Sequence, residues 1–122
     1  MPAIAEFIAV NIDCAQPPAL ATFYSGLTGG EVTYTSDEYA SVTLPGGVNV
    51  FFQGVADHRP PQWPGADRPQ QYHLDFYVED LDKAEAAACE AGAGVPEFQP
   101  GGERWRVLTD PAGHPFCLCL RA

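Results

Sequence analysis

A histidine, a carboxylate and a phenol are spaced two residues apart within residues 71–80, at His73, Asp75 and Tyr77. Apolar residues occupy the positions between them, which is the alternation of an extended strand with one face on a core. The three polar side chains then share the opposite face. We predict that they line a concave small-molecule site, although a strand that simply faces solvent shows the same alternation.

His73 and Asp75 are the predicted catalytic pair. From the same strand face, Asp75 could orient the imidazole of His73 or act as a base. It could equally pair with Arg104 or Arg106 on another strand, and the sequence leaves both readings open.

Four cysteines are present, and free thiols are predicted for all of them. Cys117 and Cys119 lie two apart in an apolar run, so they share a strand face and are poorly placed to bridge each other. Residues 1–6 lack the basic and apolar pattern of a signal peptide, which predicts a cytoplasmic, reducing location. Cys117 could pair with His73 as a nucleophile, but the sequence favours a buried, inert thiol.

Two similar runs of elements are predicted to position these residues. The first run comprises a strand at 7–13, a helix opened by Pro17 and Pro18 and ended by Gly29 and Gly30, and strands at 31–36, 39–44 and 48–53. The second comprises the strand within 71–80, a helix capped by Asp80 and ended by Gly92, a short edge strand at 95–98, and strands at 103–109 and 115–120. Each half therefore reads βαβββ, so the chain contains an internal repeat. Aligning the halves sets Ala9 against His73 and Phe51 against Cys117.

A proline-rich linker at residues 55–70 separates module 1–54 from module 71–122, and together they form one predicted domain, 1–122. The strand faces that point away from the helices, with the linker tryptophan, supply the predicted ligand-binding residues. These are Asn11, Asn49, Phe51, Gln53, Trp63, His73, Tyr77, Trp105 and Cys117.

Composition narrows the classes of partner. The chain has 122 residues, 46% of them hydrophobic, and a formal net charge of −10. This predicts one compact domain that binds neither nucleic acid nor anionic membranes, because both carry negative charge. No apolar run is long enough to predict a membrane span.

Two tandem βαβββ units, Phe23-Tyr24 in the first helix and Asp-Pro-Ala-Gly-His-Pro-Phe at 110–116 resemble the vicinal oxygen chelate superfamily. Residues 12–14, 72–75 and 105–107 are similar to its glyoxalase-like bacterial branch. The resemblance implies an α+β fold in which two tandem βαβββ modules form a curved mixed sheet, the glyoxalase/bleomycin resistance/dioxygenase fold. It also implies a homodimer.

Metal-dependent members of this superfamily take ligands from the first and last strand of each module. Carried onto this chain, those positions are Ala9, Phe51, His73 and Cys117. Ala9 and Phe51 cannot coordinate an ion, which leaves only His73 and Cys117 and falls short of a catalytic zinc or iron site. No cofactor is therefore expected, and a divalent metal is the less favoured alternative.

The resemblance and the lining residues together predict a metal-independent protein that binds an aromatic or flat small molecule in the sheet cup, of the resistance or sequestration type. The alternative is a lyase, isomerase or epimerase that uses His73 and Asp75 as acid–base groups, with or without a divalent metal. A cup filled by its own side chains is the third reading.

Overall fold

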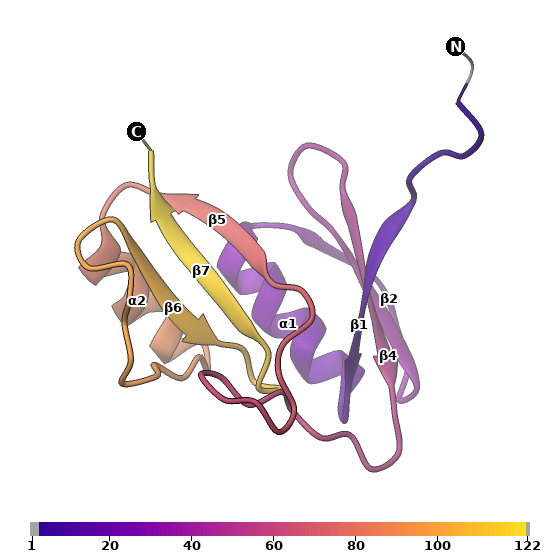
Figure 1. Cartoon of the computed structure of the whole chain (residues 1–122). Helices are drawn as coiled ribbons and strands as arrows, with labels where there is room; N and C mark the ends of the chain where they lie inside the picture. Colours follow the sequence, from indigo (N-terminus) through magenta and orange to yellow (C-terminus); the bar gives the residue numbers. More distant parts are fainter. Residues whose placement is uncertain (1–2, 122) are drawn as a thin grey trace. The chain divides into compact units, whose positions relative to one another are not determined.

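The computed structural model describes residues 3–121 (Figure 1). The chain forms two compact units, and the boundary between them falls between His58 and Arg59, inside the predicted linker. Each unit contains one helix and one mixed sheet. The predicted α+β class is confirmed. Within residues 3–121, no helix is both long and apolar enough to cross a membrane.

The first unit contains β1 (Ala9–Cys14), α1 (Pro17–Thr28), β2 (Glu31–Thr35), β3 (Tyr39–Thr43) and β4 (Asn49–Gly54). Its strand order is β1-β4-β3-β2, with β1 parallel to β4 and the other pairs antiparallel. The elements fall close to their predicted ranges because the turns between them carry glycine, proline or aspartate.

Helix α1 forms where the sequence predicts it. Pro17 occupies the first turn, and Gly29 ends the helix with a left-handed φ of 76°, donating its N–H to the Ser25 carbonyl at 2.9 Å. Tyr24 is buried and stacks on Phe52 of β4, with ring centroids 5.6 Å apart. This apolar contact fixes the helix on one face of its sheet.

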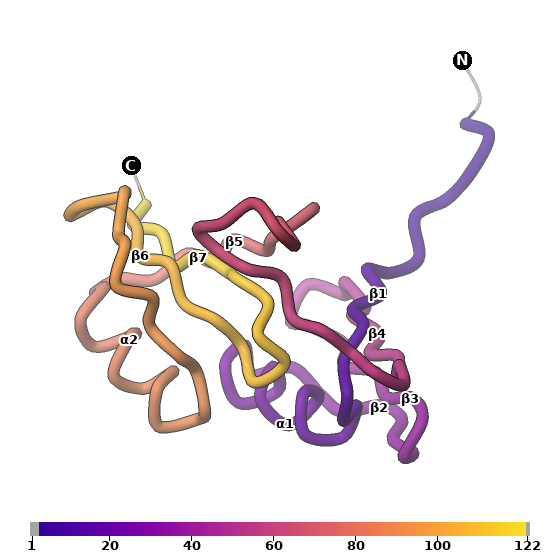
Figure 2. The backbone as a smooth tube through the Cα atoms, turned by 60° about the horizontal axis from the view of Figure 1, so that its bottom comes forward, coloured from indigo at the N-terminus to yellow at the C-terminus, as the bar shows by residue number. Residues whose placement is uncertain are grey.

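The second unit contains β5 (Leu74–Val78), α2 (Leu81–Glu90), β6 (Trp105–Thr109) and β7 (Pro115–Leu120). Its strand order is β5-β7-β6, with β5 parallel to β7 and β6 antiparallel to it. Asp80 caps α2 by accepting a hydrogen bond from the Lys83 N–H at 2.9 Å. In Figure 2, α2 lies on one side of β6 and β7, and the loop that precedes β5 lies on the other.

The internal repeat is visible in the register of the two parallel strand pairs. Asn11 of β1 lies opposite Phe51 of β4, and Asp75 of β5 lies opposite Cys117 of β7. Both pairings preserve the alignment made from sequence, in which Phe51 matches Cys117. Equivalent positions in the two units therefore point to equivalent sheet faces.

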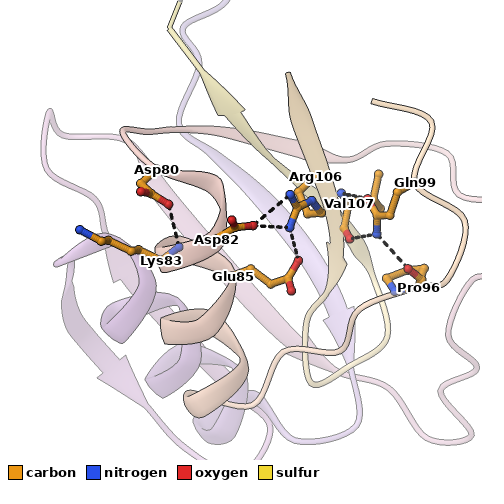
Figure 3. A network of polar contacts seen from close by, with 8 residues as sticks. All are labelled: Asp80, Asp82, Lys83, Glu85, Pro96, Gln99, Arg106 and Val107. Carbon is orange, nitrogen blue, oxygen red and sulfur yellow. Dashed lines mark hydrogen bonds and ion pairs between the residues drawn. The ribbon is translucent and has the colours of Figure 1, made fainter. Parts of the chain in front are cut away.

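The predicted edge strand at 95–98 is wrong. Only Gly94 bridges to Thr109, and Pro96, which has no N–H, cannot continue a ladder. The side chain of Gln99 takes the place of a strand on β6: its Oε1 accepts from the Val107 N–H and its Nε2 donates to the Val107 carbonyl, both at 2.8 Å (Figure 3). The second unit is thus βαββ.

Candidate functional site

The candidate site lies on the face of the second sheet that points away from α2. Asp75 and Tyr77 of β5 are exposed, whereas the alternating residues Leu74, Phe76 and Val78 are half-buried. This confirms the period-two pattern predicted for the strand. The site therefore begins as an exposed row on an edge strand of a one-sided sheet.

Strand register brings residues from all three strands onto this face. Asp75 lies opposite Cys117, which in turn lies opposite Val107 of β6. Two residues further along β7, Cys119 lies opposite both Tyr77 and Trp105. Residues 42 positions apart in sequence, such as Asp75 and Cys117, therefore become neighbours only because the sheet forms.

The loop at residues 59–70 packs against the rest of the second unit and forms a wall beside this face. The Gln62 N–H donates to the Arg68 carbonyl at 2.6 Å, which closes the loop. Gly113 packs so closely against Pro60 that a Cβ at position 113 would lie 2.3 Å from the Pro60 Cβ. Trp63 packs on Phe98, with ring centroids 5.6 Å apart. This part of the predicted linker is thus a structured component of the unit.

The loop and the sheet line a half-open cavity of about 310 Å³. Five predicted site residues line it: Trp63, His73, Asp75, Trp105 and Cys117. The lining also includes Gln70, Pro100, Val107, Pro115 and Cys119, which the predicted set lacked. All of these residues belong to the second unit.

The His73 imidazole and the Asp75 carboxylate are in polar contact at the rim, with 3.2 Å between Nε2 and Oδ1 and with side chains that are 40% and 61% exposed. The alternative partner Arg106 points to the other face of the sheet. There it binds Glu85 of α2 at 2.6 Å and Asp82 at 3.4 Å (Figure 3). Because Arg106 lies one residue away from the site face of β6, the alternation of the strand removes it from Asp75.

Cys117 is buried, and its thiol is held in the protonated form. Burial, together with the charge of Asp75, the neighbouring Cys119 and a hydrogen bond with Asp75, raises the pKa of Cys117 to about 12. Burial and Asp75 also raise the pKa of Cys119. A thiol of this kind is a poor nucleophile near neutral pH, which agrees with the prediction of an inert cysteine.

Ligand atoms of His73, Asp75 and Cys117 lie within 4.8 Å of one another. One nitrogen, one oxygen and one sulfur donor match the number of protein ligands in a catalytic zinc site. Asp75 was not among the predicted metal candidates. It joins them because it lies two residues from His73 and directly opposite Cys117. The residues present therefore fit a three-ligand site for a divalent ion that prefers nitrogen and sulfur.

Five predicted ligand-binding residues are not among those that line this cavity. Tyr77 shares the face but lies beneath the guanidinium of Arg121, 4.3 Å from its ring centroid. The other four belong to the first unit: Asn11, Asn49, Phe51 and Gln53. Asn49 there accepts a hydrogen bond from the Thr43 hydroxyl at 2.8 Å, and Phe51 packs on Tyr39 with ring centroids 5.7 Å apart. Their role in ligand binding stays a prediction.

Cys119 and Gln70, two lining residues that the prediction lacked, differ in whether the sequence carried a signal for them. Cys119 follows from Cys117 by the two-residue period of β7, so the sequence held a usable signal. Gln70 lies in irregular backbone after Pro69 and follows no period. Only the path of the loop brings it to the cavity.

The chain is a small α+β protein built from an internal repeat. Its cavity lies on the sheet face that no helix covers. A family model described as the glyoxalase-like domain matches residues 9–119. The chain therefore belongs to the glyoxalase-like domain family. No curated protein matches the chain.

Solved structures share this fold. A glyoxalase/bleomycin resistance protein/dioxygenase family enzyme from Burkholderia phytofirmans superposes with a TM-score of 0.69 at 21% identity, covering 95% of this chain and 98% of that one. A fosfomycin resistance protein from Listeria monocytogenes gives 0.72 at 12% identity, covering 98% and 96%. A bleomycin-binding protein complexed with bleomycin gives 0.60 at 16%, covering 97% and 100%. At these identities the likeness concerns the fold.

Proposed function

We propose that this protein binds a flat, aromatic small molecule in the cavity of its second unit, without needing a metal ion. The observation that carries the proposal is the meeting of Trp63, Trp105 and the His73–Asp75 pair around one cavity. The tryptophan rings supply area for a planar ligand, and the His73–Asp75 pair supplies polar contacts that fix its orientation.

The lining has the composition of a ligand site. Pro100, Val107 and Pro115 give it apolar walls, and only a few polar groups reach it. Stacking on a tryptophan adds about 0.5–1.5 kcal/mol beyond the burial of area. The volume of about 310 Å³ suits a molecule of one or two fused rings.

Two fold relatives support a resistance or sequestration role. One is described as a bleomycin-binding protein and the other as a fosfomycin resistance protein. Holding a toxic molecule requires affinity and no chemical step, which a cavity without a reactive thiol can provide. A cytoplasmic location, as predicted from the sequence, would suit that role.

Intrinsic fluorescence tests the proposal directly, because the chain has only two tryptophans and both line the cavity. Titration with quinoline and naphthalene derivatives should quench the emission saturably. Trp105→Leu should weaken binding about three- to ten-fold through lost stacking. Tyr72→Leu, at an exposed aromatic residue outside the lining, is the matched control. Absence of saturable quenching by any flat aromatic probe would contradict the proposal.

A second candidate function is acid–base catalysis of the lyase, isomerase or epimerase type, with or without a divalent metal. The triad of His73, Asp75 and Cys117 favours it. These three residues would hold the ion, and a divalent ion would supply a Lewis acid that polarises a carbonyl oxygen. Without an ion, His73 and Asp75 would move the proton themselves.

Metal content and base catalysis separate this candidate from the first. Equilibrium dialysis with Zn²⁺ should show one bound ion that Cys117→Ser releases and Cys89→Ser retains, since Cys89 is exposed and outside the triad. Elimination of 5-nitrobenzisoxazole, a flat substrate opened by a general base, should be slowed by Asp75→Asn and not by Glu79→Gln. If the protein neither binds an ion nor turns over this substrate, the catalytic function is excluded and the binding function is the one that remains.

A further inference from the structure

We infer that the ligand class for this cavity is a flat molecule that carries an N–H donor, and that the side-chain oxygen of Gln70 is the group that recognises the donor. This inference deepens the proposed function and rests on it. A flat amine or aminoheterocycle fits the site, and a flat carboxylate does not.

The first observation is an acceptor without a partner. Gln70 lines the cavity, and its Oε1 is buried and accepts no hydrogen bond from any group within residues 3–121. Buried side-chain oxygens in folded proteins are nearly always paired. A rotation of the Gln70 side chain would bring this oxygen to the cavity surface, where a ligand donor would complete its hydrogen bonding and gain a contact that an apolar ligand cannot make.

The second observation is that contacts of the chain flank Gln70 on both sides. The hydrogen bond between Gln62 and Arg68 closes the loop two residues earlier, and the Arg68 Nε donates to the Pro60 carbonyl at 3.3 Å. Three residues later, His73 pairs with Asp75. Gln70 therefore lies between two fixed points of the chain, which lowers the entropic cost of a directional contact from its side chain.

The third observation is the charge around the cavity. Among the described residues that line it there is a carboxylate, Asp75, and neither lysine nor arginine. The whole chain carries a formal net charge of −10. A carboxylate or phosphate ligand would be repelled, whereas an N–H donor with partial or full positive charge gains from Asp75 and from the faces of the tryptophans.

Three quinoline probes of similar area test donor recognition through tryptophan quenching. They are 4-aminoquinoline, which carries N–H donors, 1-methylquinolinium, which carries charge without a donor, and quinoline-4-carboxylate. For the wild-type protein we expect 4-aminoquinoline to bind about five- to ten-fold more tightly than 1-methylquinolinium. Quinoline-4-carboxylate should bind most weakly of the three.

Variants assign the preference to Gln70. Gln70→Leu should bring the affinity for 4-aminoquinoline down to that for 1-methylquinolinium and leave the latter unchanged. Gln71→Leu makes the same change at the exposed neighbouring position and should keep the preference. Gln70→Asn, which retains an amide but withdraws the oxygen, serves as a second variant if circular dichroism shows that Gln70→Leu is unfolded.

The outcomes distinguish this inference from the function on which it rests. If all three probes bind equally, or if Gln70→Leu and Gln70→Asn both keep the wild-type preference, the inference is overturned and the binding function stands. If no probe quenches the tryptophans saturably, the binding function fails and takes the inference with it.

Discussion

His73, Asp75 and Cys117 are placed by two different kinds of neighbourhood. A two-residue spacing sets His73 beside Asp75, and strand register sets Asp75 opposite Cys117. The Asp75 carboxylate acts on both of the other side chains. It pairs with the imidazole and contributes to raising the pKa of the buried thiol. Substitution of Asp75 should therefore change the pKa and the reactivity of the Cys117 thiol.

The first prediction concerns the reactivity of Cys117. A thiol with a pKa of about 12 carries roughly 1,000-fold less thiolate at neutral pH than one at the ordinary value of 9.0. Iodoacetamide at pH 8 should therefore modify exposed Cys89 and spare Cys117, as read by peptide mass mapping.

Asp75→Asn should speed the alkylation of Cys117, because it removes a charge that opposes the thiolate. The rate should stay below that of Cys89, since burial is the largest cause of the raised pKa. Glu79→Gln removes a carboxylate that does not contribute to this pKa and is the control. Equal rates for Asp75→Asn and wild type would show that the carboxylate does not act on the thiol.

The second prediction concerns stability at alkaline pH. The folded pKa of Cys117 lies above the ordinary value of 9.0, at about 12, so the folded state favours the protonated thiol. The resulting stability is fully present below pH 9 and is lost as the pH rises toward 12. Urea unfolding at pH 8 and pH 10.5 should show a smaller loss for Cys117→Ser than for wild type. Cys89→Ser should lose as much as wild type, and parallel losses in all three proteins would contradict the assignment.

At the scale of elements, the Gln99 side chain occupies the edge of β6 where a further strand would otherwise pair. Gln99 binds both backbone groups of Val107, and its Nε2 also donates to the Pro96 carbonyl at 2.9 Å. The edge of β6 is thereby satisfied without a further strand, which leaves the loop at 95–104 free to follow its own path. Trp105 follows directly and lines the cavity, so the Gln99 contact supports one wall of the site.

The third prediction tests this contact. Gln99→Ala leaves the N–H and carbonyl of Val107 without protein partners and should lower the free energy of unfolding by about 1–3 kcal/mol. Urea denaturation measures the loss, and hydrogen exchange should show faster exchange at the Val107 amide. Glu97→Ala, at an exposed position of the same loop, should change neither. An unchanged midpoint for Gln99→Ala would show that the contact is dispensable.

At the scale of the whole molecule, the resemblance predicts a homodimer, and the first unit offers an edge for it. Strand β2 lies at the end of its sheet, and all five of its residues are exposed, including Val32 and Tyr34. An edge of this kind invites pairing with another chain unless charge protects it.

The fourth prediction is therefore a sedimenting mass of twice the 13.1 kDa chain at micromolar concentration. Val32→Lys places a charge on the edge and should shift the mass toward the monomer. Glu31→Lys is the control: it alters the charge at a position that is already polar and should leave the mass unchanged. Sedimentation velocity distinguishes the outcomes. A wild-type monomer, or a dimer unaffected by Val32→Lys, would remove β2 from the interface.

The sequence alone determined the helices, the strands that alternate or end at turn residues, the repeat and the family. These features depend on local patterns: Pro17 and Gly29 bound a helix whatever surrounds it, and the alternation from His73 to Val78 assigns faces within one strand. Strand faces predicted His73, Asp75, Trp105 and Cys117 as site residues, the linker added Trp63, and all five line the cavity.

Tertiary structure alone decided which of those residues meet. Cys117 reaches Asp75 through pairing between strands distant in sequence, and Gln70 reaches the cavity through a loop without periodicity. Arg106 leaves Asp75 for α2 because strand alternation turns it to the other face. At 95–98 the Gln99 side chain takes the place of the expected edge strand: Pro96 already weakened that strand in the sequence, but only the fold shows which side-chain amide bonds the edge of β6 instead. Such pairings are set by which chain segments the fold brings into contact, and spacing along the chain carries no record of them.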